Sequence, residues 1–151
     1  ARTRIMRNDT LAVLLPKNRM VHGYAQAFQE AGIKVETAKD LNFANDKPKI
    51  LTYHGAKGLT FDSVLMPRLV NYSFRYFNDD EIHRQIFVGI TRAQSWVYLS
   101  AVKHQRTPVL DRVLHLEAKR QLTLQKYGQA ETVHVNTVQQ TADEEDDFFD
   151  F

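Results

Sequence analysis

The stretch Ile50-Leu-Thr-Tyr-His-Gly-Ala-Lys-Gly-Leu-Thr-Phe-Asp-Ser-Val-Leu-Met-Pro67 decides how this chain is expected to fold. Its first four residues predict a buried strand, which opens into a glycine-containing loop that carries His54, Lys57 and Thr60. These three side chains suit phosphate groups, and a loop at the end of a strand is where open α/β sheets bind ligands. The stretch therefore predicts an α/β fold with a polar site at one edge of the sheet.

A second stretch, Gln85-Ile-Phe-Val-Gly-Ile-Thr-Arg-Ala93, predicts an amphipathic helix with an arginine near its end. The helix is expected to run from Asp79 to Ala93, and the acidic residues of its first turn favour its N-terminus through the helix dipole. Its apolar positions recur at helical spacing and are expected to be buried. Arg92 then precedes a predicted strand, Trp96–Val102, and an arginine so placed can reach a nucleotide held elsewhere.

The residues before these stretches also alternate between strand and helix patterns. The apolar run Leu11–Pro16 predicts a strand buried on both faces, as parallel sheets require. Helical spacing predicts a helix over Arg19–Ala31, with Asn18 as its N-cap and Gly32 at its C-terminal end. Ile33–Thr37 is predicted to be a short strand. Strands that alternate with helices imply a parallel sheet wrapped by helices.

The remaining segments are predicted from weaker patterns. Ser63–Pro67 is a third apolar strand, and Asn71–Asp80 mixes aromatic and polar residues, which predicts a loop with a short helical turn. Apolar residues at roughly helical intervals predict a helix over Val109–Lys126. Thr132–Val138 alternates and is predicted to be an edge strand.

Composition limits the class of protein. At 151 residues the chain fits one domain, expected over residues 1–138, followed by a tail at 139–151 that is too charged to bury itself. The chain has no cysteine, which excludes disulfides and thiolate metal sites, and no metal site is predicted. No apolar run approaches the ~20 residues that span a bilayer, and no signal peptide is visible. We therefore expect a cytoplasmic protein without membrane contact, and the absence of an initiator Met fits a segment of a longer protein.

Charge is distributed unevenly along the chain. The net charge is +2, but six of the 18 acidic residues lie in the last nine positions, so the remainder carries 20 basic against 12 acidic residues. A basic body suits nucleic acid, although a mildly basic surface that only aids solubility explains the charge equally well. The tail, with Phe148, Phe149 and Phe151 among its acidic residues, is either a solubilising tail or a docking peptide.

Together, Thr52–Asp62 and Val88–Ala93 resemble the last two signature motifs of UvrD-like superfamily 1 helicases. The resemblance implies the second, C-terminal RecA-like domain of such an enzyme, of the compact type without the large inserted domain. No Gly-x-x-x-x-Gly-Lys-Ser/Thr segment occurs in the chain. The resemblance therefore implies that ATP and Mg²⁺ are bound mainly by the N-terminal RecA-like domain of the same parent chain. This chain alone is not expected to hydrolyse ATP.

The resemblance also implies roles for the residues of the first motif. Thr52 and His54 match residues that contact single-stranded DNA, whereas Lys57, Gly58 and Thr60 match residues that line the ATP cleft. The family usually has Glu at the place of Thr60, where it reaches the ribose, and a threonine is shorter and neutral. The alternative for His54 and Lys57 is a solvated loop end.

Arg92 matches the arginine finger of the family, which stabilises the charge that develops during phosphoryl transfer. The alternative is a helix-terminal arginine that offsets the helix dipole. An earlier and weaker motif implies that His22 stands where the family has an arginine near the γ-phosphate. Arg19, one helical turn before His22, could supply the lost charge, and the alternative for His22 is a surface histidine.

Two functions follow from these observations. The first is the second motor domain of an ATP-dependent DNA helicase, which supplies Arg92 to the ATP site and part of the track for single-stranded DNA. The second is a non-enzymatic helicase-like module that docks a DNA-repair or replication protein through its acidic tail. The presence of Arg92 and of the complete Thr52–Asp62 motif favours the helicase.

Overall fold

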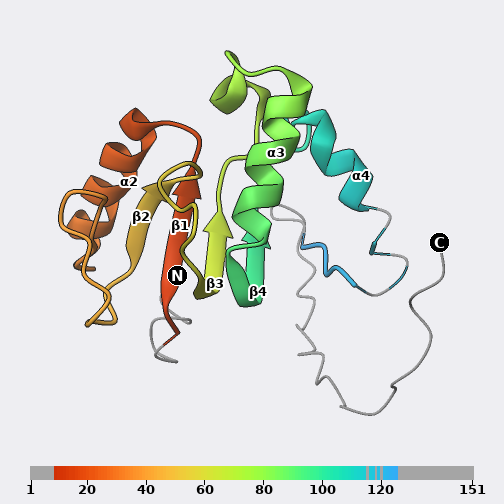
Figure 1. The fold of residues 1–151 in the computed structure, drawn as a ribbon. Coiled ribbons are helices and arrows are strands. Elements are labelled where there is room, and N and C mark those ends of the chain that lie inside the picture. The colour runs from red at the N-terminus through yellow and green to blue at the C-terminus, as the bar shows by residue number, and fades with distance from the viewer. Residues whose placement is uncertain (1–8, 115, 118, 120, 126–151) are drawn as a thin grey trace, which may run out of the picture. The chain divides into compact units, whose positions relative to one another are not determined.

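The computed structural model describes residues 9–114, 116, 117, 119 and 121–125, and its centre is a four-stranded parallel sheet (Figure 1). The strands lie in the order β2-β1-β3-β4 and all run in the same direction. They are β1 (Leu11–Leu15), β2 (Lys49–Thr52), β3 (Phe61–Met66) and β4 (Ala93–Leu99). This arrangement confirms the predicted α/β class, a parallel sheet flanked by helices.

Helices pack against both faces of the sheet, α2 (Asn18–Glu30) on one and α3 (Asp79–Ile90) on the other. Successive residues of a strand point to opposite faces, so the continuous apolar run of β1 serves both layers. The buried side chains on the α2 side are Val13, Leu15, Val21 and Ile50. Those on the α3 side include Ala12, Leu14, Leu51, Val64, Met66, Ile82 and Ile86.

α3 begins with a capping box and passes close to the sheet. The Asn78 side chain accepts a hydrogen bond from the Glu81 N–H (2.9 Å), and the Glu81 carboxylate accepts one from the Asn78 N–H (2.9 Å). Gly89 faces the sheet, where an added Cβ atom would lie 2.6 Å from Met66 Cε and 3.1 Å from Tyr53 Cε1. The glycine of the second sequence motif therefore lets the helix that carries Arg92 approach the strands closely.

α2 ends as predicted but begins differently. Gly32 has φ of +75°, and the N–H groups of Gly32 and Ile33 donate to carbonyls of the last helical turn, which completes the glycine termination. The prediction that Asn18 caps the helix is wrong. Asn18 is the first helical residue, Lys17 occupies the N-cap position, and no side chain caps this end within the described chain.

The prediction of a strand at Ile33–Thr37 is also wrong, because only Glu36 forms a bridge to β2, opposite Lys49. The Glu36 carboxylate instead accepts hydrogen bonds from Lys49 Nζ (2.9 Å), the Asn42 N–H (2.8 Å) and Asn45 Nδ2 (2.6 Å). These bonds, the one from Lys49 foremost, lower the pKa of Glu36 to about 2. A polar network around the Glu36 carboxylate, together with a single bridge to β2, therefore fixes the connection that leads into β2.

The predicted long helix over Val109–Lys126 is wrong as well. The structure has a short 3-10 turn, η2 (Pro108–Leu110), and one helical turn, α4 (Asp111–Leu114), and the described residues beyond form turns at 116, 117 and 119 and no regular structure over 122–125. Leu116 and Leu122 are only partly buried. Val109 and Leu110 are buried in the core, so the packing of this segment is concentrated at its start, and packing supplies most helical stability in proteins.

The last strand of the sheet begins earlier than predicted. β4 starts at Ala93, and α3 ends at Ile90, because the Arg92 carbonyl accepts a hydrogen bond from the Phe61 N–H (2.8 Å) at the start of β3. The predicted edge strand Thr132–Val138 and the acidic tail lie outside the described residues.

The chain divides into two compact units, Ala1–Val113 and Leu114–Phe151. The sheet and every candidate site residue belong to the first unit. The proposed division into a domain at 1–138 and a tail at 139–151 stays a prediction. Among the residues that the structure describes, no helix combines the length and apolar character needed to cross a membrane.

Candidate functional site

The residues that follow β2 form a tight turn at the carboxyl edge of the sheet, where the strands end (Figure 1). Thr52 closes this turn, because its hydroxyl oxygen accepts a hydrogen bond from the Gly55 N–H (3.0 Å) and its carbonyl accepts one from the Ala56 N–H (3.0 Å). His54 is exposed on the turn. The two residues predicted to contact DNA, Thr52 and His54, therefore lie on one turn at this edge.

Tyr53, between these two residues, fixes the turn to the core. Its side chain is 2% exposed, and its ring stacks on the Phe74 ring with centroids 6.3 Å apart. Burial raises the pKa of Tyr53 well above its ordinary value, so the phenol stays neutral near pH 7. The turn is thus held from the core side while His54 is exposed.

The loop then continues to the amino edge, where β3 and β4 begin. Lys57 and Gly58 are exposed, and Gly58 has φ of +78°, a conformation that favours glycine. Thr60 is exposed directly before β3, and its hydroxyl accepts a hydrogen bond from Gln94 Nε2 (3.3 Å). One loop therefore starts at Thr52 on the carboxyl edge and reaches Thr60 on the amino edge.

Arg92 lies beside the end of this loop. Its guanidinium donates hydrogen bonds to the Val88 carbonyl (from Nε, 3.2 Å), the Leu59 carbonyl (from Nη1, 3.3 Å) and the Thr91 hydroxyl (from Nη2, 3.1 Å). The bond to Val88 is a helix-end contact, whereas the bond to Leu59 crosses to the residue before Thr60. The structure thus brings Arg92 and Thr60, from the two sequence motifs, to the same edge.

This arrangement suits a phosphate group. An arginine side chain has five N–H donors, and the three hydrogen bonds above use three of them. The half-buried Arg92 guanidinium can therefore donate to further anionic oxygens while it stays fixed. In the described part of the chain, no three His, Cys, Asp or Glu side chains are grouped so that they could hold a metal ion. The amino edge thus presents the Arg92 guanidinium and the Thr60 hydroxyl, whereas the nearby Asp62 carboxylate at the start of β3 is bound by Thr10.

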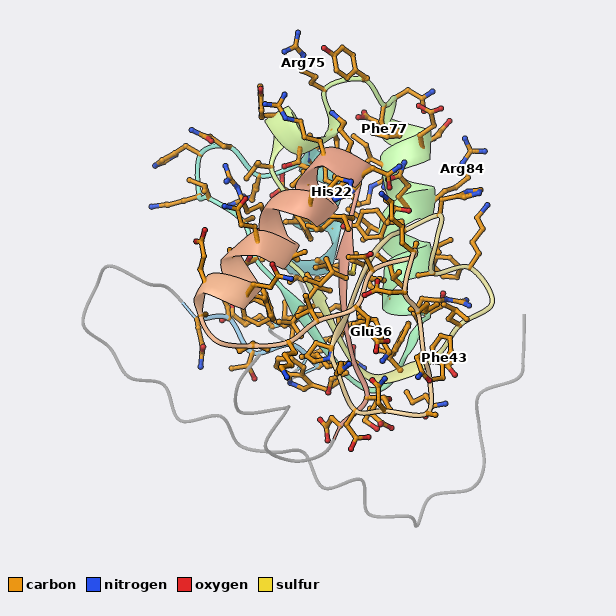
Figure 2. All side chains as sticks on the ribbon, turned by 90° about the vertical axis from the view of Figure 1, so that its left-hand side faces the viewer. His22, Glu36, Phe43, Arg75, Phe77 and Arg84 are labelled. Atoms are coloured by element: carbon orange, nitrogen blue, oxygen red, sulfur yellow. The ribbon has the colours of Figure 1, made fainter. Side chains whose placement is uncertain are left out.

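Arg19 and His22 lie elsewhere. Both are exposed in the first turns of α2, which begins after β1 at the carboxyl edge, and His22 is labelled in Figure 2. Arg92 precedes β4 and therefore lies at the amino edge. The residues predicted to form one ATP group are divided between the two edges, with Thr60 next to Arg92 and with Arg19 and His22 on the side of Thr52.

α2 also borders an open groove of about 350 Å³, lined by Met20, Gly23, Tyr24, Ala27 and Arg68. Arg68 follows β3 and has φ of +55°, in the left-handed region that residues other than glycine rarely adopt. Burial raises the pKa of Tyr24, against the opposing effect of the Arg68 charge. The groove thus contributes the Arg68 cation to the carboxyl edge.

Sequence reasoning missed two residues of this site. Gln94, which contacts Thr60, was hidden because β4 was predicted to begin at Trp96, so that Gln94 was assigned to a connection. Tyr53 was included in the predicted buried strand but not recognised as the support of the turn. Its position between Thr52 and His54 could have indicated this role, because successive residues of a strand point to opposite faces of the sheet.

Known proteins resemble this chain over the same region. The model of the UvrD-like helicase C-terminal domain family matches residues 11–104, which include every candidate site residue. A probable DNA helicase of Mycoplasma pneumoniae (strain ATCC 29342 / M129) is 32% identical over 102 residues, which are 62% of this chain and 18% of that relative. A crystal structure of the C-terminal domain of a possible DNA helicase from Lactobacillus plantarum WCFS1 has the same fold. Its TM-score is 0.62 at 23% identity, over 74% of this chain and 67% of that one.

Proposed function

Because the chain belongs to the UvrD-like helicase C-terminal domain family, we propose that it is the second motor domain of an ATP-dependent superfamily 1 DNA helicase. In this role it supplies an arginine finger to the ATP site and part of the track for single-stranded DNA. The observation that carries the proposal is the direct contact between the two sequence motifs, Thr52–Asp62 and Val88–Ala93. The Arg92 guanidinium bonds the Leu59 carbonyl (3.3 Å), and the Arg92 carbonyl accepts from the Phe61 N–H (2.8 Å).

At the amino edge, Arg92 acts on the substrate ATP. Phosphoryl transfer places negative charge on the equatorial oxygens of the γ-phosphate, and a guanidinium that is already oriented stabilises this charge without reorganisation. Hydrogen bonds to Val88, Leu59 and Thr91 supply that orientation. Thr60 lies next to Arg92 and offers a hydroxyl group to the nucleotide.

At the carboxyl edge, Thr52 and His54 contact the backbone of a single strand. The Thr52 hydroxyl accepts from Gly55 and still has its own proton to donate, and the exposed His54 ring can donate to a phosphate oxygen. Because one loop joins Thr52 to Thr60, a shift of the loop at the nucleotide can move the DNA contact. This connection is the proposed route from ATP turnover to movement along DNA.

The proposal assigns the remaining parts of the ATP site to another domain. ATP phosphates and Mg²⁺ are held mainly by an N-terminal RecA-like domain of the same protein, with Lys57 and Gly58 lining the facing side of the cleft. The chain spans 18% of its Mycoplasma relative, which leaves ample length for such a domain in a related protein.

The test is Arg92→Ala in the longer helicase that is proposed to contain this chain. We expect kcat for ATP to fall by at least about a hundredfold with ATP affinity nearly unchanged, because a finger acts on transition-state charge. Arg92→Lys should recover little, since an ammonium group lacks the planar donor fork. Steady-state ATPase kinetics and nucleotide-binding titrations measure both quantities.

Arg84→Ala is the matched control, because Arg84 is an exposed arginine on the same helix (Figure 2). It should leave kcat unchanged. If Arg92→Ala also kept a normal kcat, Arg92 would be only a helix-end residue and the proposal would fail. The second candidate function, a non-enzymatic module that acts through the acidic tail, depends on residues 139–151, which lie outside the described residues.

A further inference from the structure

The segment between β3 and α3 carries four aromatic side chains and the cation Arg75, and Lys17 from the start of α2 lies beside them. Tyr72 and Tyr76 are 72% and 74% exposed. The Arg75 guanidinium carbon lies 6.0 Å from the centre of the Tyr72 ring and 4.8 Å from that of Tyr76, and Lys17 Nζ lies 4.8 Å from the Tyr76 ring centre. We call Lys17, Tyr72, Arg75 and Tyr76 the cation–aromatic surface.

The exposed rings stand on a fixed base. Asn71–Phe74 forms the 3-10 helix η1, which confirms the predicted short helical turn. Phe74 is 1% exposed and stacks on Tyr53, and Phe77 packs edge-on against Phe74 with ring centroids 6.2 Å apart. Phe74 therefore belongs to the core and the partly buried Phe77 packs against it, whereas the two tyrosines contribute their rings to the surface.

This surface adjoins the predicted DNA contacts. Lys17 follows β1 and η1 follows β3, so both lie at the carboxyl edge with Thr52 and His54. Figure 2 shows Arg75 projecting from one end of the molecule, with Glu36 and Phe43 toward the other. The Tyr53–Phe74 ring pair directly links the turn that carries His54 to the helix that carries Tyr72.

We infer that the cation–aromatic surface binds single-stranded DNA by stacking unpaired bases on Tyr72 and Tyr76. Arg75 and Lys17 then neutralise the neighbouring phosphates. Two exposed rings beside the Arg75 guanidinium suit a single strand, which presents unpaired bases beside phosphates, and aromatic stacking accepts every base because each has a π-face. A duplex offers phosphates but no free base faces. The inference rests on the proposed function and adds a base contact to its backbone contacts.

The experiment measures binding of labelled oligothymidine, about 16 nucleotides long, to the 151-residue chain by fluorescence anisotropy. Tyr72→Ala and Tyr76→Ala should each weaken binding at least about fivefold. Tyr72→Phe and Tyr76→Phe keep the rings and should bind normally. Binding of a duplex of the same length should be unchanged in all four variants, because its bases are already stacked.

Charge is tested separately with Arg75→Gln and with Arg84→Gln, an exposed arginine on α3 that serves as the matched control. Arg75→Gln should weaken binding more than Arg84→Gln and should reduce the salt dependence. Normal binding by the two Tyr→Ala variants while His54→Ala binds weakly would overturn the inference and leave the proposed function intact. Absence of any binding by the unaltered chain at low salt would also overturn it, whereas the Arg92 experiment still decides the proposed function.

Discussion

The two edges of the sheet hold their candidate residues in different ways. At the carboxyl edge, His54, Tyr72 and Tyr76 are exposed on short turns, and the buried rings of Tyr53 and Phe74 fix the backbone beneath them. At the amino edge the functional side chain itself is fixed. Three hydrogen bonds hold the Arg92 guanidinium, and one of them comes from the loop that begins at the other edge.

This difference matches the two tasks proposed for the edges. A contact that forms and breaks as a strand moves benefits from exposed rings and an imidazole that can adapt to successive nucleotides. A charge that stabilises a transition state must already have the productive orientation before the reaction. One domain can thus support the backbone of a turn at one edge and a side chain at the other, with a single loop between them.

The largest effect is expected at Gly89, because it supports both edges. The added atoms of Gly89→Val meet Met66 and Tyr53, so α3 must move away from the sheet. Overpacking of a core costs about 1–3 kcal/mol, and we expect that loss in the free energy of unfolding, measured by urea denaturation. The shift of α3 also moves Arg92 and Tyr53, so ATP turnover and DNA binding should fall together.

Gly23→Ala is the control, because an added Cβ atom at Gly23 meets nothing within 4 Å. Alanine is more favourable than glycine inside a helix, so the free energy of unfolding of this variant should rise by about 0.5–1 kcal/mol. An unchanged stability of Gly89→Val would show that α3 does not need its close approach to the sheet. Loss of only one activity would show that the two edges do not share this support.

A smaller and one-sided effect is expected from His54→Ala in the longer helicase. One hydrogen bond to a phosphate contributes about 1 kcal/mol, so DNA-stimulated ATPase at subsaturating DNA should fall about fivefold. Basal ATPase should stay normal, because Arg92 and Thr60 are at the other edge. ATPase titrations with and without single-stranded DNA measure both, and equal losses would assign His54 to the fold or to the ATP cleft.

Helices and strands that depend on a local pattern or a motif were predicted from the sequence. Elements that depend on packing were not. The run Leu11–Leu15 and the capped, amphipathic α3 were predictable because their apolar spacing and caps are local. The failures were at Ile33–Thr37, where only Glu36 pairs with β2 and its carboxylate binds Lys49, and at Val109–Lys126, where Val109 and Leu110 are buried in a 3-10 turn but Leu116 and Leu122 are only partly buried. In each case tertiary contacts, which the local pattern does not reveal, decided the outcome.

The candidate site was predictable to a similar extent. Motif resemblance assigned Thr52 and His54 to DNA and Thr60 and Arg92 to the ATP site, but only the parallel order of the strands places the two pairs at opposite edges of the sheet. The cation–aromatic surface was visible only as aromatic residues without a period. Its separation into buried phenylalanines and exposed tyrosines requires knowledge of what η1 packs against.

Glu36→Gln is expected to have the smallest effect on ATP turnover and on DNA binding. It alters the connection into β2 and leaves the predicted contacts to ATP and to DNA unchanged. The folded-state pKa of Glu36 is about 2, below its ordinary value of 4.5, because Lys49, Asn45 and Asn42 donate hydrogen bonds to the ionised carboxylate. A lowered pKa means that the carboxylate stabilises the fold fully above pH about 4.5 and that this stabilisation is lost as the pH falls toward about 2. At pH 7 the variant should therefore be less stable than the unaltered chain.

The difference in stability between Glu36→Gln and the unaltered chain, measured as the difference in urea midpoint, should be largest above pH about 5. It should shrink steadily toward pH about 3. Asp40 and Asp62 also have lowered pKa values, through hydrogen bonds donated by Thr37 and Thr10, but both are unchanged in the variant and cancel in the difference. A gap that stayed constant with pH would mean that the geometry of the Glu36 side chain matters and its charge does not. We expect the charge to matter, because the Lys49 side chain is 5% exposed and its buried ammonium loses its ionised partner both in Glu36→Gln and when Glu36 is protonated in the unaltered chain.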